Sequence, residues 1–217
     1  MNDFDPSLGL INLLVSDLKP VRTGVVRRQV LAALGICAIA MLMIVLQLWG
    51  VRPDLVAALP TMAFWTKEAF VIVLTIAGVG AMLRLARPDG AARASARFAF
   101  GTAITMAVLA MLQIATSPQS LWRHLVMGKT AEVCPWLIML LALPILAVAL
   151  FIMRRMAPTQ LMAAGAAAGL AAGGLAALVY SVACDESAMP FILVWYGAAI
   201  LAMTLLGAVL GPRTIRW

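Results

Sequence analysis

Six unbroken apolar runs, each about as long as the 20 residues an α-helix needs to cross a lipid bilayer, dominate this sequence. Soluble chains are roughly half apolar and a quarter charged. This chain is 64% hydrophobic and 12% charged, with a mean hydropathy of +1.03. The sequence therefore predicts an all-α, polytopic membrane protein, a six-helix transmembrane bundle. The expected spans lie near 29–49, 68–86, 98–116, 135–153, 161–183 and 190–210.

The basic residues are divided unevenly between the two sides of these spans. Twelve of the 16 lysines and arginines fall on the side of the N-terminus, whereas Arg52, Lys67, Arg123 and Lys129 fall on the other. Because positively charged segments stay in the cytoplasm, we expect both termini to be cytoplasmic. The net charge of +7 is then explained by the membrane topology and by attraction to anionic lipids. We expect no direct binding of nucleic acid.

Residues 1–28 form a cytoplasmic N-terminal segment, and residues 29–217 hold the six-span bundle. Asp5 and Pro6 make a favourable helix start. An apolar stripe then follows at helical spacing, formed by Leu8, Ile11, Leu14, Val15 and Leu18. Such an amphipathic helix has three uses: docking into a partner's groove, lying on lipid, or packing against the bundle. Asp17 on its polar face weakens the lipid alternative.

Charged residues are expected only at the edges of the spans. Lys67 and Glu68 stand at the edge of the second run, and Arg52 with Asp54 should form a surface turn or a local ion pair of little stabilising value. Ion-coupled transporters usually place ionisable groups at bilayer depth. A small membrane transporter or channel without ion-coupling residues is therefore kept only as the alternative function.

The sequence gives little support to an enzyme. It contains no nucleophile–base pairing, no His-rich metal motif and no Cys-x-x-Cys pair. The fifth span instead carries small residues at four-residue spacing, Gly165, Gly169 and Gly173, and Gly207 and Gly211 repeat this pattern in the sixth. Small residues let helix backbones approach closely in lipid, so tight packing is expected there.

Two cysteines provide the main candidate site. Cys134 begins the fourth span and Cys184 closes the fifth, while Cys37 lies inside the first span and is expected to pack as an apolar residue. The fourth and fifth spans are joined by a short turn, so they should be antiparallel neighbours. Their outer ends would then lie close enough to allow a disulfide, which requires Cα atoms within about 7 Å.

Three roles remain open for this thiol pair. The first is a structural disulfide, which is natural in an oxidising compartment. The second is a redox switch, and the third is a metal-responsive pair. Further metal ligands would come from His124, Glu132, Asp185 or Glu186. Nearby carboxylates are expected to raise the pKa of the thiols and to slow thiolate chemistry.

A further set of residues runs along nearly the whole chain and is most specific in its C-terminal third. It consists of Leu18-Lys19-Pro20-Val21, Arg52-Pro53-Asp54-Leu55, Cys134, the Gly/Ala run ending in Tyr180, Cys184 with Glu186, Phe191, Trp195-Tyr196, and Gly211-Pro212-Arg213 to Arg216-Trp217. In these residues the chain resembles the NrsF-type anti-sigma factors, six-span inner-membrane proteins that hold an extracytoplasmic-function (ECF) sigma factor inactive.

The resemblance implies a regulator of transcription in the bacterial inner membrane. Its ECF sigma factor would be held by the cytoplasmic segment 1–28, and Cys134 and Cys184 would sense oxidants or heavy metals outside the cytoplasm. Transient metal binding at the cysteine pair, with His124 as a candidate ligand, is the only cofactor expected. The inducer, the sigma factor and the oligomeric state stay open.

Overall fold

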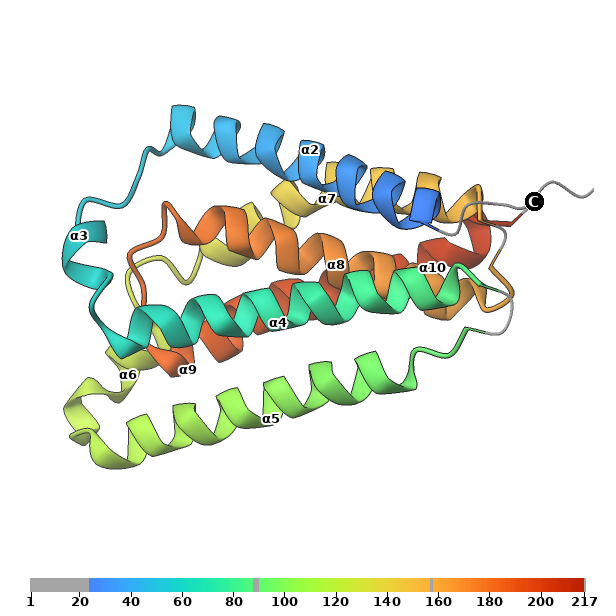
Figure 1. The fold of residues 1–217 in the computed structure, drawn as a ribbon. Helices are drawn as coiled ribbons and strands as arrows, with labels where there is room; N and C mark the ends of the chain where they lie inside the picture. The colour runs from blue at the N-terminus through green and yellow to red at the C-terminus, as the bar shows by residue number, and fades with distance from the viewer. Residues whose placement is uncertain (1–23, 88–89, 157, 217) are drawn as a thin grey trace, which may run out of the picture.

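The computed structural model describes residues 24–87, 90–156 and 158–216, and all regular structure in these ranges is helical (Figure 1). Within these ranges, six helices are long and apolar enough to cross a membrane. They are α2 (Gly24–Leu48), α4 (Met62–Leu85), α5 (Arg93–Thr116), α7 (Cys134–Arg154), α8 (Leu161–Ser181) and the segment Met189–Thr214. The last segment joins α9 (Met189–Phe191), the π-helical stretch η1 (Ile192–Tyr196) and α10 (Gly197–Thr214). The all-helical fold is confirmed for the described residues, and helices of spanning length and composition lie where the six spans were predicted.

Two short helices lie between the spans, α3 (Leu55–Ala58) and α6 (Gln119–Met127). The helix α4 begins earlier than predicted, because Thr61 caps it: the Thr61 hydroxyl accepts a hydrogen bond from the Phe64 amide at 3.3 Å. Lys67 and Glu68 consequently lie inside the helix and are buried. They stay within the first two turns of α4, near its start as predicted, but their burial was not predicted.

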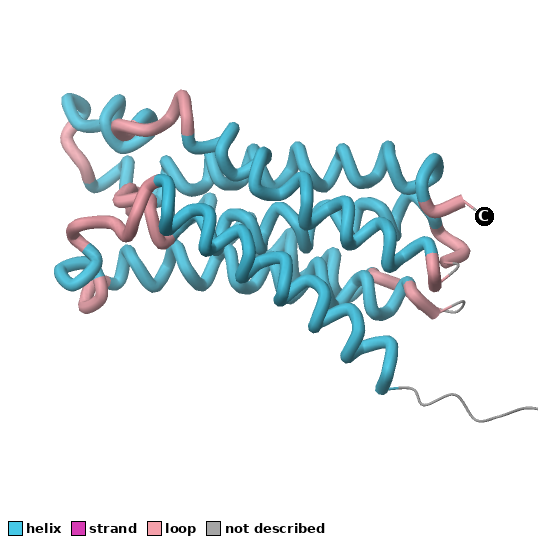
Figure 2. The backbone as a smooth tube through the Cα atoms, turned by 90° about the horizontal axis from the view of Figure 1, so that it is seen from above, coloured by secondary structure: helices cyan, strands magenta, loops and turns pink. Residues whose placement is uncertain are grey.

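The ends of the described chain lie at one end of the bundle (Figures 1 and 2). The start of α2 and the C-terminal end of α10 are there, whereas α3, α6 and the connection from α8 to α9 lie at the opposite end. We call that opposite end, with Cys134 and Cys184, the cysteine end. Residues 1–23 of the predicted segment 1–28 lie outside the described residues. They include the whole predicted stripe of Leu8, Ile11, Leu14, Val15 and Leu18.

The helix α8 is the most buried span and packs against α4, α7 and α10. Its glycines allow this approach: a Cβ atom on Gly165 would overlap the Gly207 carbonyl, and one on Gly169 would overlap the Met203 carbonyl. The contact with α4 is similar, since a Cβ on Gly78 would overlap the Ala171 backbone. The small-residue spacing thus serves the close packing that was predicted.

The helices α2 and α5 are the least buried spans. Large apolar side chains on both are exposed, among them Ile36, Phe98 and Met111. Trp65 and Trp122 are also exposed, and each donates a hydrogen bond from its indole nitrogen to a backbone carbonyl at the cysteine end. Such amphipathic rings are typical of the boundary between lipid and water.

The helix contact gives a direct test. Replacing Gly169 by Val should lower the melting temperature in detergent by about 5 °C or more, because overpacking a close contact costs about 1–3 kcal/mol. The matched control is Gly101→Val in α5, where an added Cβ meets nothing within 4 Å. Thermal unfolding followed by circular dichroism measures both. Equal melting temperatures for the two variants would contradict the packing.

Candidate functional site

The two predicted cysteines meet at the cysteine end. Cys134 is the first residue of α7 and Cys184 follows α8 by three residues. Both side chains are buried and both are free thiols. The two thiols lie within reach of a mutual hydrogen bond. The predicted proximity of the outer ends of these two spans is therefore confirmed.

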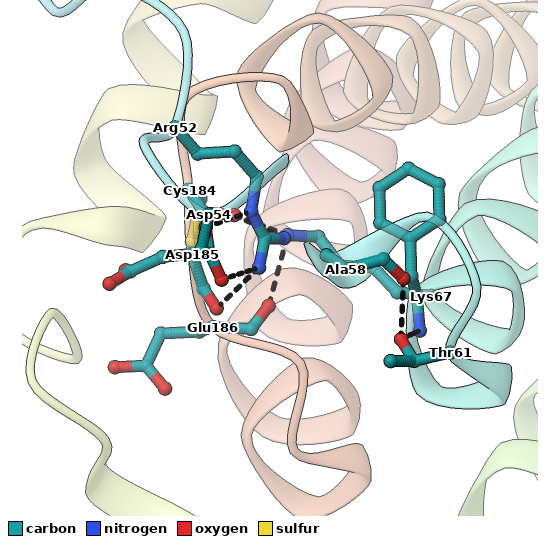
Figure 3. A network of polar contacts seen from close by, with 9 residues as sticks. Arg52, Asp54, Ala58, Thr61, Lys67, Cys184, Asp185 and Glu186 are labelled. Carbon is teal, nitrogen blue, oxygen red and sulfur yellow. Dashed lines mark hydrogen bonds and ion pairs between the residues drawn. The ribbon is translucent and has the colours of Figure 1, made fainter. Parts of the chain in front are cut away.

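Two cations hold the backbone around Cys184 (Figure 3). The Lys67 ammonium donates hydrogen bonds to the carbonyl oxygens of Cys184 at 2.9 Å and of Glu186 at 3.0 Å. The Arg52 guanidinium donates to the carbonyl of Cys184 at 3.2 Å and to that of Asp185 at 3.0 Å. Three consecutive carbonyls of a connection without regular structure thereby gain partners. We call Arg52 and Lys67 the cation grip.

Arg52 is anchored by its own neighbours. Its Nε and Nη2 donate to the two carboxylate oxygens of Asp54, each at 2.7 Å, and its backbone amide donates to the Val182 carbonyl at 3.1 Å. This fork holds the pKa of Asp54 below its usual value and raises the pKa of Arg52. The predicted local ion pair is confirmed. The predicted surface position is wrong for Arg52, which is buried because its side chain turns inward to the carbonyls after α8.

Lys67 carries its charge into the interior of the bundle. Its side chain is fully buried, and its Nζ lies 5.3 Å from the centre of the Tyr196 ring, within the range of a cation–π contact. Tyr196 ends the π-helical stretch η1. Such stretches are frequent at functional sites. The next residue along the chain, Glu68, accepts a hydrogen bond from the Ser181 hydroxyl at 3.1 Å.

The surroundings of Cys184 favour its thiolate. The hydrogen bond from Cys134 lowers the pKa of Cys184 most, and the Lys67 charge, the Tyr196 hydroxyl and the Glu186 backbone amide lower it further, against the opposing effect of burial. The Tyr196 hydroxyl acts by proximity, since it has no hydrogen-bond partner of ordinary geometry. The prediction that nearby carboxylates would raise the pKa is therefore wrong for Cys184. Hydrogen-bond donors and a cation act on this sulfur, while Asp185 is exposed.

The segment from α6 to α7 closes over the same connection. The Lys129 amide donates to the Glu186 carboxylate at 2.6 Å, and Gly128 adopts a φ of +51°, a conformation that favours glycine. A Cβ at Gly128 would meet the Glu186 carboxylate at 2.6 Å. The Trp195 indole donates to the Val126 carbonyl at 2.8 Å. The glycine therefore leaves room for Glu186 to reach the backbone of this segment.

The proposed metal ligands do not gather around the thiols. Within the described residues, no group of three or more His, Cys, Asp and Glu side chains is arranged to hold a metal ion. His124 and Glu132 line a hollow beside α6 that neither cysteine borders. Metal binding by Cys134 and Cys184 with His124 stays a prediction. Cys37 lies in α2 and packs partly buried against the core, as expected for an apolar role.

Sequence reasoning missed the cation grip and Tyr196 as parts of the site. One signal was present: Lys67 and Glu68 are adjacent charges directly before a long apolar run, and ionisable groups in a span have a functional role by default. The partners are separated from Lys67 by more than 110 residues, which no local pattern reveals.

Comparison with known proteins shows the family. The model of the family described as "Negative regulator of sigma F", NrsF, matches residues 14–217. This chain belongs to the NrsF family. It is 36% identical over 210 residues to the probable anti-sigma-F factor NrsF of Azospira oryzae, covering 96% of this chain and 98% of that protein. It is 36% identical over 194 residues to the anti-sigma-F factor NrsF of Caulobacter vibrioides, covering 88% and 89%. No solved structure matches the chain.

Membership in the NrsF family confirms the resemblance inferred from the sequence. The family match includes α2 to α10 and therefore the cation grip and both cysteines. It also includes Leu14, Val15 and Leu18 of the predicted stripe, whereas Leu8 and Ile11 lie before its start.

The lowered pKa of Cys184 gives a pH test. Alkylation requires the thiolate, so its rate rises with pH through the pKa of the thiol. For Cys184, we expect the midpoint of the curve of alkylation rate against pH to lie below about 8.5, the pKa of an ordinary cysteine. In Cys134→Ala the midpoint should move upward, because the strongest favourable contact is lost. Mass spectrometry of iodoacetamide-treated protein measures it, with Cys37→Ala as control. An unchanged midpoint in Cys134→Ala would contradict this account of the site.

Proposed function

We propose that this protein is an inner-membrane anti-sigma factor that sequesters an ECF sigma factor through its cytoplasmic N-terminus and releases it on a thiol-sensed signal from outside the cytoplasm. It acts as a regulator and not as an enzyme. The observation that carries the proposal is the pair of adjacent buried thiols, Cys134 and Cys184, in a six-span member of a family whose curated relatives are named as anti-sigma-F factors.

The sigma contact is assigned to the stripe of Leu8, Ile11, Leu14, Val15 and Leu18. Burial of one such side chain is worth about 1.5–3 kcal/mol before entropy costs, so a few are sufficient for micromolar binding. A stripe held against the sigma factor would keep that factor from RNA polymerase. Leu18 lies six positions before Gly24, where the described part of α2 begins.

The two ends of the molecule support a sensor and an output on opposite sides of the membrane. The thiols lie at the cysteine end, whereas α2 begins, and α10 ends, at the other end (Figure 1). The uneven distribution of basic residues favours the cytoplasm for the end that carries both termini. An oxidant or a heavy metal would thus act on Cys134 and Cys184 from the periplasm.

The helix packing offers a direct route between the two ends. Cys134 is the first residue of α7, and α7 packs against α2, which continues the N-terminal segment. Few residues of α2 are buried, Val30, Leu34 and Val45 among them, so this helix is held weakly. A change in affinity of roughly 5- to 150-fold needs a coupling free energy of only about 1–3 kcal/mol.

Charges placed in the stripe test the sigma contact. We expect Leu14→Asp combined with Leu18→Asp to weaken binding of the sigma factor by about 100-fold or more, because two apolar side chains lose their burial and two charges are desolvated. The matched control is Asn12→Asp with Ser16→Asp, which adds the same charges on the polar face. Co-purification of the full-length protein with the sigma factor of its own host measures both. Undiminished co-purification with the Leu14 and Leu18 variant would overturn the assignment.

A further inference from the structure

Lys67 is a buried ammonium without a carboxylate partner. Among the residues that the structure describes, the one ion pair joins Arg52 and Asp54. Glu68 uses one carboxylate oxygen to accept from Ser181, and its other oxygen is buried without a partner. A charge removed from water is costly unless hydrogen bonds and an opposite charge offset that cost. Lys67 has two carbonyls and the Tyr196 ring, but no anion among these contacts.

The thiol pair supplies negative charge beside this ammonium, in addition to the nearby Glu68 carboxylate. Lys67 donates to the carbonyl of Cys184 itself, and its charge interacts with the sulfurs of both Cys184 and Cys134. Arg52 donates to the same carbonyl but already has the Asp54 carboxylate. Among the described residues, Lys67 is therefore the cation beside the pair that has no ion-pair partner. When the two cysteines form a neutral disulfide, this cation loses the negative charge of the Cys184 thiolate.

We propose that Lys67 sets the reduction potential of the Cys134–Cys184 pair, as a positioning residue whose charge stabilises the reduced form, with Cys184 as a thiolate, against the disulfide. The inference rests on the proposed thiol-sensing function and names the residue that adjusts the reduction potential of the thiol pair. A reduced form that is stabilised in this way makes the corresponding disulfide easier to reduce. Easily reduced disulfides are the regulatory ones, and structural disulfides resist reduction. The geometry thus favours the redox switch over the permanent disulfide.

The oxidation balances with a small disulfide as the oxidant. The Cys184 thiolate attacks one sulfur of the oxidant, which forms a mixed disulfide and expels the other sulfur as a thiolate. Cys134 then gives up its proton to that thiolate and attacks the Cys184 sulfur. The second half of the oxidant leaves as a thiolate and takes a proton from water. Two electrons pass from the protein thiols to the oxidant, and the intramolecular disulfide remains.

A redox titration tests the proposal. The full-length protein, with Cys37→Ser to remove the third thiol, is placed in nanodiscs and equilibrated with graded ratios of reduced and oxidised glutathione at one pH. A maleimide polymer then traps the free thiols, and gel mobility gives the disulfide fraction. In Lys67→Met, we expect the equilibrium constant for disulfide formation to rise at least about tenfold, which corresponds to about 30 mV.

The equilibrium constant is the appropriate readout because both thiols are buried. A variant that merely loosens the cation grip would lower the effective concentration of the two thiols and would move the constant toward the dithiol, opposite to the expected shift. Lys67→Arg keeps the charge and should stay within threefold of the parent. Lys129→Met, the loss of an exposed lysine from the same end, should also stay within threefold.

Two results would overturn the inference. One is a constant for Lys67→Met that stays within threefold of the parent or moves toward the dithiol. The other is a shift in Lys67→Arg as large as that in Lys67→Met. Should Lys67→Met fail to fold, Lys67→Gln carries the same expectation, since its amide donates hydrogen bonds without a charge.

The titration also separates this inference from the proposed function, because it involves no sigma factor. An expected shift together with a sigma factor that stays bound after oxidation would support the inference and contradict the proposed function. An absent shift together with release on oxidation would do the reverse.

Discussion

The cation grip on the connection after α8 is the interaction on which the cysteine end depends. Residues 184–188 have no regular structure, and the carbonyls of Cys184, Asp185 and Glu186 find their partners in Arg52 and Lys67. Buried carbonyls without partners cost about 1–3 kcal/mol each. The grip offsets that cost, and it joins the connection before α4, α4 itself and the end of α8 in one network (Figure 3). Cys184 takes its position and part of its charge environment from this network.

The close packing of α8 determines where the grip can act. Gly78 and Gly174 let α4 and α8 approach at the level of the backbone, and Lys67 lies about three turns from Gly78 along α4. On its other side, α8 meets α10 through Gly165, Gly169 and Gly207. This contact aligns the segment that carries Tyr196 under the Lys67 ammonium. The small residues, which have no chemistry of their own, thus bring a cation, a thiol pair and an aromatic ring together.

Hydrophobicity was sufficient to predict the six spans, because a bilayer demands long apolar helices whatever they contact. The short turn between the fourth and fifth spans likewise predicted that Cys134 and Cys184 would meet. The cation grip could not be predicted, because it joins residues more than 110 positions apart and depends on the Thr61 cap that places Lys67 inside α4. The pKa of Cys184 was misjudged for the same reason: adjacent carboxylates were visible in the sequence, and distant cations were not.

In the function that we propose, the redox state of one thiol pair controls how firmly the other end of the molecule holds a sigma factor. The most direct test is the affinity of the intact protein in nanodiscs for the sigma factor that co-purifies from its host, with Cys134 and Cys184 either reduced or joined as a disulfide. The account predicts that the disulfide form binds about 5- to 150-fold more weakly. A Cys134→Ser, Cys184→Ser variant should bind equally under both conditions. Affinities for the two forms of the parent that agree within twofold would contradict the account.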